Sequence, residues 1–397
     1  MGHLFERIRG RIAKDEAGHI WAPGRLACLY APIVVTDIHT KQYLPGRISP
    51  SLRHSYYHLE QIILNMTADD SVPEVVLVTQ LPTTTCWFES TCARPNGKVL
   101  ATRVDEPELY EFDPEQPDEP LRLVCTVPEC NGLAHICSLK GREDEYAVMT
   151  AMIDLEAVSV AYNMLWRVAF DGKSDGQPSV TKLAALPGIG MGAECAAVSE
   201  RTMLITDTKK ACIWALDLPT GNTSVFFEHE TMIRAGDDHF FGLSRIRILG
   251  DYLWYANEST GSLYRVPVVK DDSANGGLRI TGPVEIITDE IPNNDGLAMT
   301  EDGTTAYSVN YVKGTLRQIK IDPVTGKSET REFMNSLLAP TTIELIQSRS
   351  TGKPKLVVIC NGRNDVAWMK DFSWSDIANI IPSETVTVTT EEVVEYV

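Results

Sequence analysis

Hydrogen-bond donors recur in this sequence where short apolar runs begin or end. Arg245, Asn310 and Arg363 each occupy such a place. A guanidinium or an amide there can donate to a carbonyl oxygen and stabilise the negative charge that develops on it. We therefore take these three residues as candidate catalytic donors.

Aromatic, methionine and small polar side chains surround these donors in the chain. If they converge, they form an apolar pocket with a few donors, which suits an apolar ligand carrying one or two oxygens. The alternative is that many of them are ordinary packing residues. The candidate binding residues are Trp87, Phe88, Asn131, His135, Met149, Tyr162, Glu194, Phe241, Ser244, Tyr311 and Asn361.

Motifs of several common enzyme classes do not occur. The sequence has no HExxH, GxSxG or P-loop motif, and no GxGxxG follows a predicted strand. His135 follows the run Asn131-Gly132-Leu133 and could act as a general base. A single histidine near an inner strand is more often a hydrogen-bonded structural residue.

The composition limits the partners. Thirty-six basic and 54 acidic residues give a net charge of −18, which argues against nucleic acid and against an anionic membrane surface. No apolar run is long enough to span a membrane. Nine cysteines without CxxC spacing indicate buried reduced thiols. With no evident signal peptide, we expect a cytoplasmic protein, either a monomer or a homodimer.

The chain changes character near residue 73. Residues 1–72 read as an extension with one amphipathic helix, Ser51–Asp70, because apolar residues there recur at steps of three or four. Residues 73–397 consist of short apolar runs separated by Gly, Asp, Asn and Pro, which indicates many short antiparallel strands.

These strands group into repeats of about fifty residues with four strands each. The groups cover residues 88–127, 132–186, 193–229, 242–288 and 295–334, and a shorter sixth group covers 341–361. This pattern predicts an all-β, six-bladed β-propeller. We expect Pro73–Pro82 to complete the sixth blade beside Thr385–Thr390. Two separate β-sandwiches are the alternative.

Three segments within Glu89–Asn361 resemble the SMP-30/gluconolactonase/LRE family of six-bladed propellers. Ile291–Lys327 is similar to the penultimate blade of that family, Ala193–Gly221 is similar to an earlier blade, and Ala93–Pro114 is closer to a fungal branch.

The resemblance implies a divalent cation, such as Ca²⁺, on the propeller axis of lactonases. Glu89 and Asp295 match two of the three family ligands. The third family ligand is an asparagine, and its position corresponds to Glu194 here, or to Ser244 if the match is shifted by one blade. Asn131 resembles the asparagine motif but lies one blade too early. The ligand set is therefore incomplete.

The fungal branch includes hetero-Diels–Alderases that join a tropolone or phenol-derived quinone methide to a humulene-type sesquiterpene. The altered ligand and the aromatic surroundings favour such a pericyclase of specialised metabolism, which needs no cofactor and binds small apolar, oxygen-bearing substrates. A metal-dependent lactonase is the second hypothesis. A non-enzymatic binding propeller is the third, and it predicts a filled axis instead of a deep pocket containing Glu89 and Asp295.

Overall fold

The computed structural model describes residues 31–35, 76–81, 86–117, 119–154, 159–172, 176–236, 239 and 241–361. The predicted helix Ser51–Asp70, the candidate donor Arg363 and the predicted strand Thr385–Thr390 lie outside the described residues. The helices of the described part are two short 3₁₀ turns, Glu230–Met232 and Asn275–Gly277, and none is long and apolar enough to cross a membrane.

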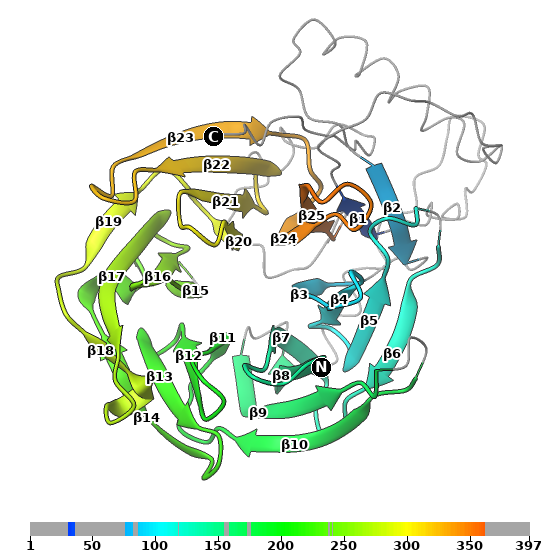
Figure 1. Ribbon diagram of the computed structural model, residues 1–397, viewed down its shortest axis with the longest axis horizontal. Coiled ribbons are helices and arrows are strands. Elements are labelled where there is room, and N and C mark those ends of the chain that lie inside the picture. Colours follow the sequence, from blue (N-terminus) through cyan, green and yellow to red (C-terminus); the bar gives the residue numbers. More distant parts are fainter. Residues whose placement is uncertain are drawn as a thin grey trace, which may run out of the picture.

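The described strands form six antiparallel sheets arranged around one axis (Figure 1). This arrangement confirms the predicted all-β propeller of four-stranded blades. The first sheet contains β3 (Phe88–Ala93), β4 (Val99–Arg103), β5 (Glu108–Phe112) and β6 (Arg122–Thr126). The second contains β7 (Gly132–Ser138), β8 (Glu145–Asp154), β9 (Ser159–Ala169) and β10 (Ser179–Ala185).

The next three sheets repeat this order from the axis outward. The third contains β11 (Gly192–Ala197), β12 (Thr202–Asp207), β13 (Cys212–Asp217) and β14 (Asn222–Glu228). The fourth contains β15 (Leu243–Leu249), β16 (Tyr252–Asn257), β17 (Ser262–Lys270) and, both paired with β17, β18 (Leu278–Ile280) and β19 (Glu285–Thr288). The fifth contains β20 (Asn294–Met299), β21 (Thr305–Asn310), β22 (Thr315–Ile321) and β23 (Ser328–Met334). The short strand β18 was not expected from the sequence.

The sixth sheet combines segments from distant parts of the chain. Its inner strands are β24 (Pro340–Gln347) and β25 (Pro354–Cys360), followed outward by β1 (Ala31–Val35) and β2 (Val76–Leu81). The expected strand within Pro73–Pro82 is thus β2, but its neighbour is β1. Because β1 comes from the predicted extension, the boundary that we expected at residue 72 does not separate that extension from the propeller.

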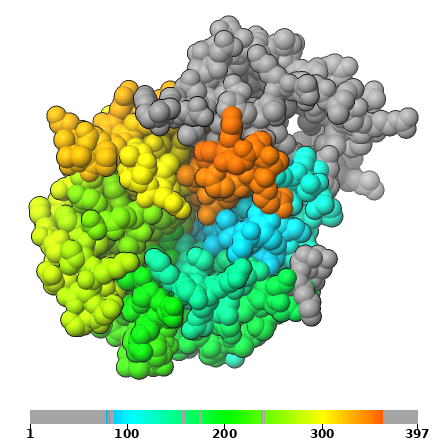
Figure 2. Space-filling model, viewed as in Figure 1, coloured from blue at the N-terminus to red at the C-terminus, as the bar shows by residue number. Residues whose placement is uncertain are grey.

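Apolar clusters lie between neighbouring sheets and close the ring. Each of the six clusters in the described part contains buried residues of two adjacent sheets. Phe88 of the first sheet packs with Ile359 of the sixth, so the first and last sheets are in contact (Figure 2). The hydrophobic effect therefore favours closure, because each sheet buries both of its faces only inside the ring.

The innermost strand of every sheet has a break in register near its first residue. These breaks lie in β3, β7, β11, β15, β20 and β24. The residues that the pairing skips include Glu89, Ala134, Glu194, Arg245, Asp295 and Thr341. A bulge leaves a residue out of the ladder and redirects its side chain. Four of these residues, Glu89, Ala134, Arg245 and Asp295, line the cavity on the axis.

Candidate functional site

A pocket lies on the propeller axis, where the inner strands begin. It holds about 850 Å³ of empty space, part of which is open to solvent. Of the residues predicted from the sequence, seven line it: Trp87, Glu89, Phe241, Ser244, Arg245, Asp295 and Tyr311. The first residues of the inner strands therefore converge on one cavity.

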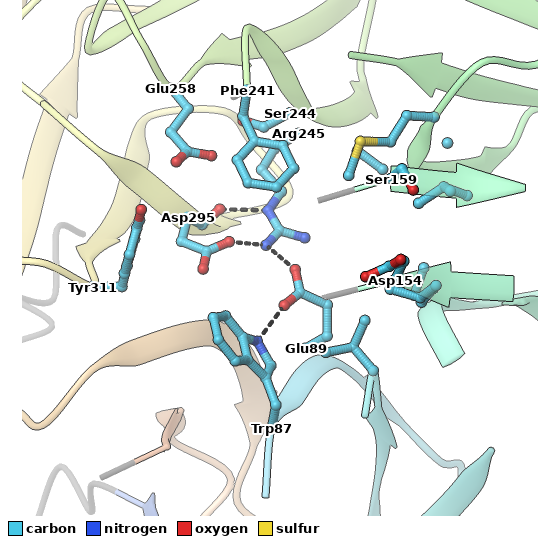
Figure 3. Close-up of a pocket in the computed structure, with 17 residues that line it drawn as sticks. Trp87, Glu89, Asp154, Ser159, Phe241, Ser244, Arg245, Glu258, Asp295 and Tyr311 are labelled. Atoms are coloured by element: carbon cyan, nitrogen blue, oxygen red, sulfur yellow. Dashed lines mark hydrogen bonds and ion pairs between the residues drawn. The ribbon is translucent and has the colours of Figure 1, made fainter. Parts of the chain in front are cut away.

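Arg245 is the centre of the polar network in this pocket (Figure 3). Its guanidinium donates to the carboxylate and the backbone carbonyl of Asp295, to Glu89 Oε1 at 3.3 Å and to the Thr341 carbonyl at 3.4 Å. Trp87 Nε1 donates to Glu89 Oε2 at 2.9 Å. These bonds come from Nε and Nη2, so Nη1 donates to none of the described residues and remains available to a ligand.

Three carboxyl groups, those of Glu89, Glu258 and Asp295, line the pocket together with this single cation. Burial raises the pKa of Glu89 to about 8, with a further rise from Asp295, although Arg245 and the Trp87 N–H lower it. Burial and Asp295 also raise the pKa of Glu258 well above its ordinary value. Burial raises the pKa of Asp295, and Arg245 offsets part of that rise. These shifts favour the protonated form of the carboxyl groups, and a protonated carboxyl group can donate a hydrogen bond.

Apolar side chains form the rest of the wall. Val104, Ile153, Val160, Met191 and Phe241 line the pocket together with Trp87 and Tyr311. Such a wall favours a ligand that is mostly apolar, and it lowers the local dielectric constant around the polar network.

The hairpin of β8 and β9 provides one side of this wall. Ile153 and Asp154 at the end of β8 and Ser159 and Val160 at the start of β9, which together form the described tip of the hairpin, line the pocket. Asn131 holds this tip in place, because its Oδ1 accepts from the Ile153 N–H at 2.6 Å and its Nδ2 donates to the Ile153 carbonyl at 2.7 Å. Asn131 therefore contributes to the pocket indirectly, as a support of the hairpin.

A narrow polar chamber continues the axis beyond Arg245, which lines both cavities. His135 and Glu194 line this chamber and not the main pocket. His135 Nδ1 accepts from the Cys195 N–H at 3.2 Å, and Nε2 lies 3.0 Å from Glu194 Oε1. Both ring nitrogens thus have protein partners, which leaves no lone pair for the predicted role of general base.

Glu194 ties the inner strands of the third and fourth sheets together. It accepts from Arg247 Nη1 at 2.5 Å and from the Ile246 N–H. Burial opposes its ionisation, but Arg247 and His135 outweigh burial and lower its pKa. Glu194 is consequently an ionised structural group and not part of the main pocket.

Several other predicted binding residues lie outside the pocket. Phe88 and Met149 are fully buried between sheets. Tyr162 is 78% exposed, and its positive φ of 55° belongs to the irregular part of the β8–β9 hairpin. Packing and solvent exposure therefore account for these three residues.

Two predicted asparagines fix strand ends. Asn310 Nδ2 donates to the Pro292 carbonyl at 2.5 Å, and its Oδ1 accepts from the Lys313 N–H at 2.8 Å. Asn361 exchanges two hydrogen bonds with the backbone of Phe88, at 2.8 and 3.0 Å, and so joins the sixth sheet to the first. Asn310 is buried and is not among the residues that line the pocket, so the structure does not place its amide where the predicted donor role needs it.

The residues present do not fit the divalent cation that the family resemblance implied. Glu89 and Asp295 both contact the guanidinium of Arg245, so a positive charge already lies between them. Ca²⁺ requires six or more oxygen ligands. In the described ranges no three acidic, histidine or cysteine side chains are grouped so that they could hold a metal ion.

Sequence reasoning missed Glu258, Val104 and the tip of the β8–β9 hairpin. Val104, Glu258 and Tyr311 each directly follow the second strand of a sheet and line the pocket. Tyr311 was predicted because it lies at the end of a second strand. The same criterion, applied to the first and fourth sheets, would have identified Val104 and Glu258. The hairpin tip has no such signal, because its place depends on the unusual length of β8 and β9.

Comparison with known proteins gives one distant relative. No family model matches the chain. A protein of Sarocladium schorii described as "Putative hetero-Diels-Alderase asR5" is 23% identical over 272 residues. The match covers 58% of this chain and 63% of the relative, which is less than two thirds of the relative's length.

Solved propellers are similar in the arrangement of their sheets. A calcium-binding protein, regucalcin, of Agrobacterium tumefaciens is 14% identical with a TM-score of 0.45, covering 70% of this chain and 92% of that one. A streptogramin B lyase is 11% identical with a TM-score of 0.44, covering 70% and 95%.

Proposed function

We propose that this chain is a pericyclase of specialised metabolism, which joins a quinone methide to an apolar alkene of the humulene type by a hetero-Diels–Alder reaction. The observation that carries the proposal is an apolar axial pocket with a guanidinium and protonated carboxyl groups at one wall. The name of the distant relative supports the same reaction class.

Positioning would supply much of the rate enhancement. Two apolar partners held together in the pocket react as one complex, which removes the entropy cost of their encounter and can contribute several kcal/mol. The apolar wall from Trp87 to Phe241 would also exclude water, which otherwise adds to a quinone methide.

Hydrogen bonding would activate the heterodiene. Arg245 Nη1 is the donor available to the quinone-methide oxygen, and Glu89 remains protonated at pH 7 because of its raised pKa. A donor on that oxygen stabilises the negative charge that grows there as the new bonds form. Asp295 holds Arg245 in place, so it acts as a positioning residue.

The pocket also bears on the alternatives. A platform protein needs no deep cavity on its axis, whereas Glu89 and Asp295 share one here. A metal-dependent lactonase needs a cation where the guanidinium of Arg245 lies. Both observations favour the pericyclase.

A direct assay uses the purified full chain, a quinone methide released in solution from a 2-(hydroxymethyl)phenol derivative, and α-humulene. We expect adduct formation at least about tenfold above the protein-free rate, which corresponds to about 1.4 kcal/mol of barrier lowering. EDTA should not change this rate, and Val324→Ala, at a site 86% exposed, serves as the matched control. A rate equal to background, or rapid hydrolysis of sugar lactones that EDTA abolishes, would overturn the proposal.

A further inference from the structure

Glu258 is a buried carboxyl group to which the mechanism above assigns no role. It directly follows β16, is 8% exposed and lines the pocket. Figure 3 shows its carboxyl group pointing into the cavity. It faces the pocket from the fourth sheet, whereas Trp87 and Glu89 face it from the first.

The backbone of Glu258 is fixed, but its side chain has no partner. Its N–H donates to the Gly242 carbonyl at 2.9 Å, and its carbonyl accepts from the Gly261 N–H at 3.2 Å. In the part of the chain that the structure describes, no hydrogen bond or ion pair reaches its carboxyl group. The charged groups that influence it, Asp295, Arg245 and Glu89, are occupied with one another.

Glu258 is 8% exposed, and the cavity is the side from which a partner can reach its carboxyl group. A leucine would suit the apolar wall at this position better than a carboxyl group does. A carboxyl group is expected at such a position where a ligand supplies the missing hydrogen bond.

We propose that Glu258 is a second polar anchor of the pocket, which binds a hydroxyl or carbonyl oxygen of the ligand. This oxygen is a different one from the oxygen to which Arg245 donates. The ligand is then an apolar molecule with two separated oxygen functions. The proposed binding role of Glu258 does not depend on the reaction. Only the identification of this ligand as a cycloaddition partner rests on the proposed function.

The protonation state of Glu258 fits this role. Burial and the nearby Asp295 raise its pKa well above the ordinary value, which favours the protonated form. A protonated carboxyl group offers one O–H donor and one carbonyl acceptor, and it can therefore bind either a carbonyl or a hydroxyl group.

The test measures binding of three probes to the full chain by NMR titration at pH 7. Acetophenone carries one oxygen, and 3-hydroxyacetophenone and 4-hydroxyacetophenone carry a second one at two different separations. The variants are Glu258→Leu, which removes the anchor, and Glu258→Gln, which keeps a donor and an acceptor. We expect Glu258→Leu to be at least as resistant to unfolding as the parent, because it removes an unpaired buried polar group.

We expect at least one hydroxylated probe to bind the parent about fivefold or more tightly than acetophenone. This gain should disappear in Glu258→Leu and be partly kept in Glu258→Gln. Equal affinities for all three probes in the parent, or an unchanged gain in folded Glu258→Leu, would overturn the anchor. Because binding requires no turnover, failure of the cycloaddition assay would leave this result standing.

Discussion

A single guanidinium organises the charges of the candidate site at the scale of individual residues. Arg245 is buried and contacts two carboxyl groups, and a third lies in the same pocket. Removing a buried cation leaves its partners without compensation, which usually costs more than the pair itself contributes. Arg245 therefore has both a structural and a proposed catalytic role.

Arg245→Met should lower the free energy of unfolding by about 3 kcal/mol and abolish the proposed activity, because Asp295 loses its buried partner. Urea denaturation with CD detection measures the change. Arg279→Met is the matched control, because Arg279 pairs with Asp271 at 3.3 Å on the surface and should change stability by less than about 1 kcal/mol. Equal effects of the two substitutions would refute this assignment.

Glu89 should make stability depend on pH. Its pKa is about 8 in the folded protein, against an ordinary value of 4.5. Between these values the unfolded chain is ionised while the folded chain keeps the proton, so the contribution of Glu89 to stability is greatest below pH 4.5 and falls until about pH 8. Glu89→Gln lacks this loss, and its stability relative to the parent should increase by roughly 3.5 kcal/mol from pH 5 to pH 8. Parallel stability curves for the two proteins would contradict the raised pKa.

Bulges and strand ends place the functional groups at the scale of elements. A break in register near the start of each inner strand directs residues such as Glu89 and Asp295 to the axis. In three sheets the position after the second strand also lines the pocket, and it supplies Val104, Glu258 and Tyr311. Within this repeating frame, the β8–β9 hairpin is the element that gives the pocket a wall on one side.

Asn131→Ala should loosen that wall, because it removes both hydrogen bonds to the backbone of Ile153. We expect a loss of about 1 kcal/mol or less in global stability, but several-fold weaker substrate binding with kcat less affected. Hydrogen exchange at the Ile153 amide should become faster. Asn131→Asp keeps the acceptor for that amide, so its exchange should stay closer to that of the parent. Unchanged exchange in Asn131→Ala would exclude the supporting role.

Closure of the ring is the feature that matters at the scale of the whole molecule. Asn361 joins β25 to β3, and β1 lies between β25 and β2. The sixth sheet therefore pairs strands that lie more than 300 residues apart in the sequence. Val34, for example, pairs with Val358.

Val34→Pro should weaken closure, because proline cannot donate a backbone hydrogen bond and fits poorly inside a sheet. We expect a loss of about 3 kcal/mol or more in stability, measured by thermal and urea unfolding. Val34→Thr retains strand propensity and is the control. If Val34→Pro unfolds like the parent, β1 does not hold the sixth sheet together.

The repeat pattern predicted most of the fold, because alternating apolar runs determine where strands lie. It predicted the strands of five sheets except β18, and it predicted β2, β24 and β25 of the sixth. It could not predict β1, because a five-residue strand far from its partner has no local signal. For the same reason the sequence did not predict that β1 pairs with β25.

The site was only partly predictable. Glu89 and Asp295 were found through the family resemblance, and Arg245 was found through its place near the start of an inner strand. The convergence of the inner strands brings the three together. The ion pair that joins them could not be foreseen, since a bulge in β15 decides which of Ser244 and Arg245 reaches the two carboxyl groups. Asn310 and Asn361 have the right chemistry for donors, but their amides bind backbone groups.

The stereochemistry of the product tests the central claim most directly. Chiral chromatography of the adduct formed from a quinone methide and α-humulene compares the full chain with the uncatalysed reaction. If both partners react inside the axial pocket beside Arg245, the protein should give one enantiomer in large excess, and Arg245→Met should give a nearly racemic adduct. A racemic adduct from the folded parent protein would contradict the account.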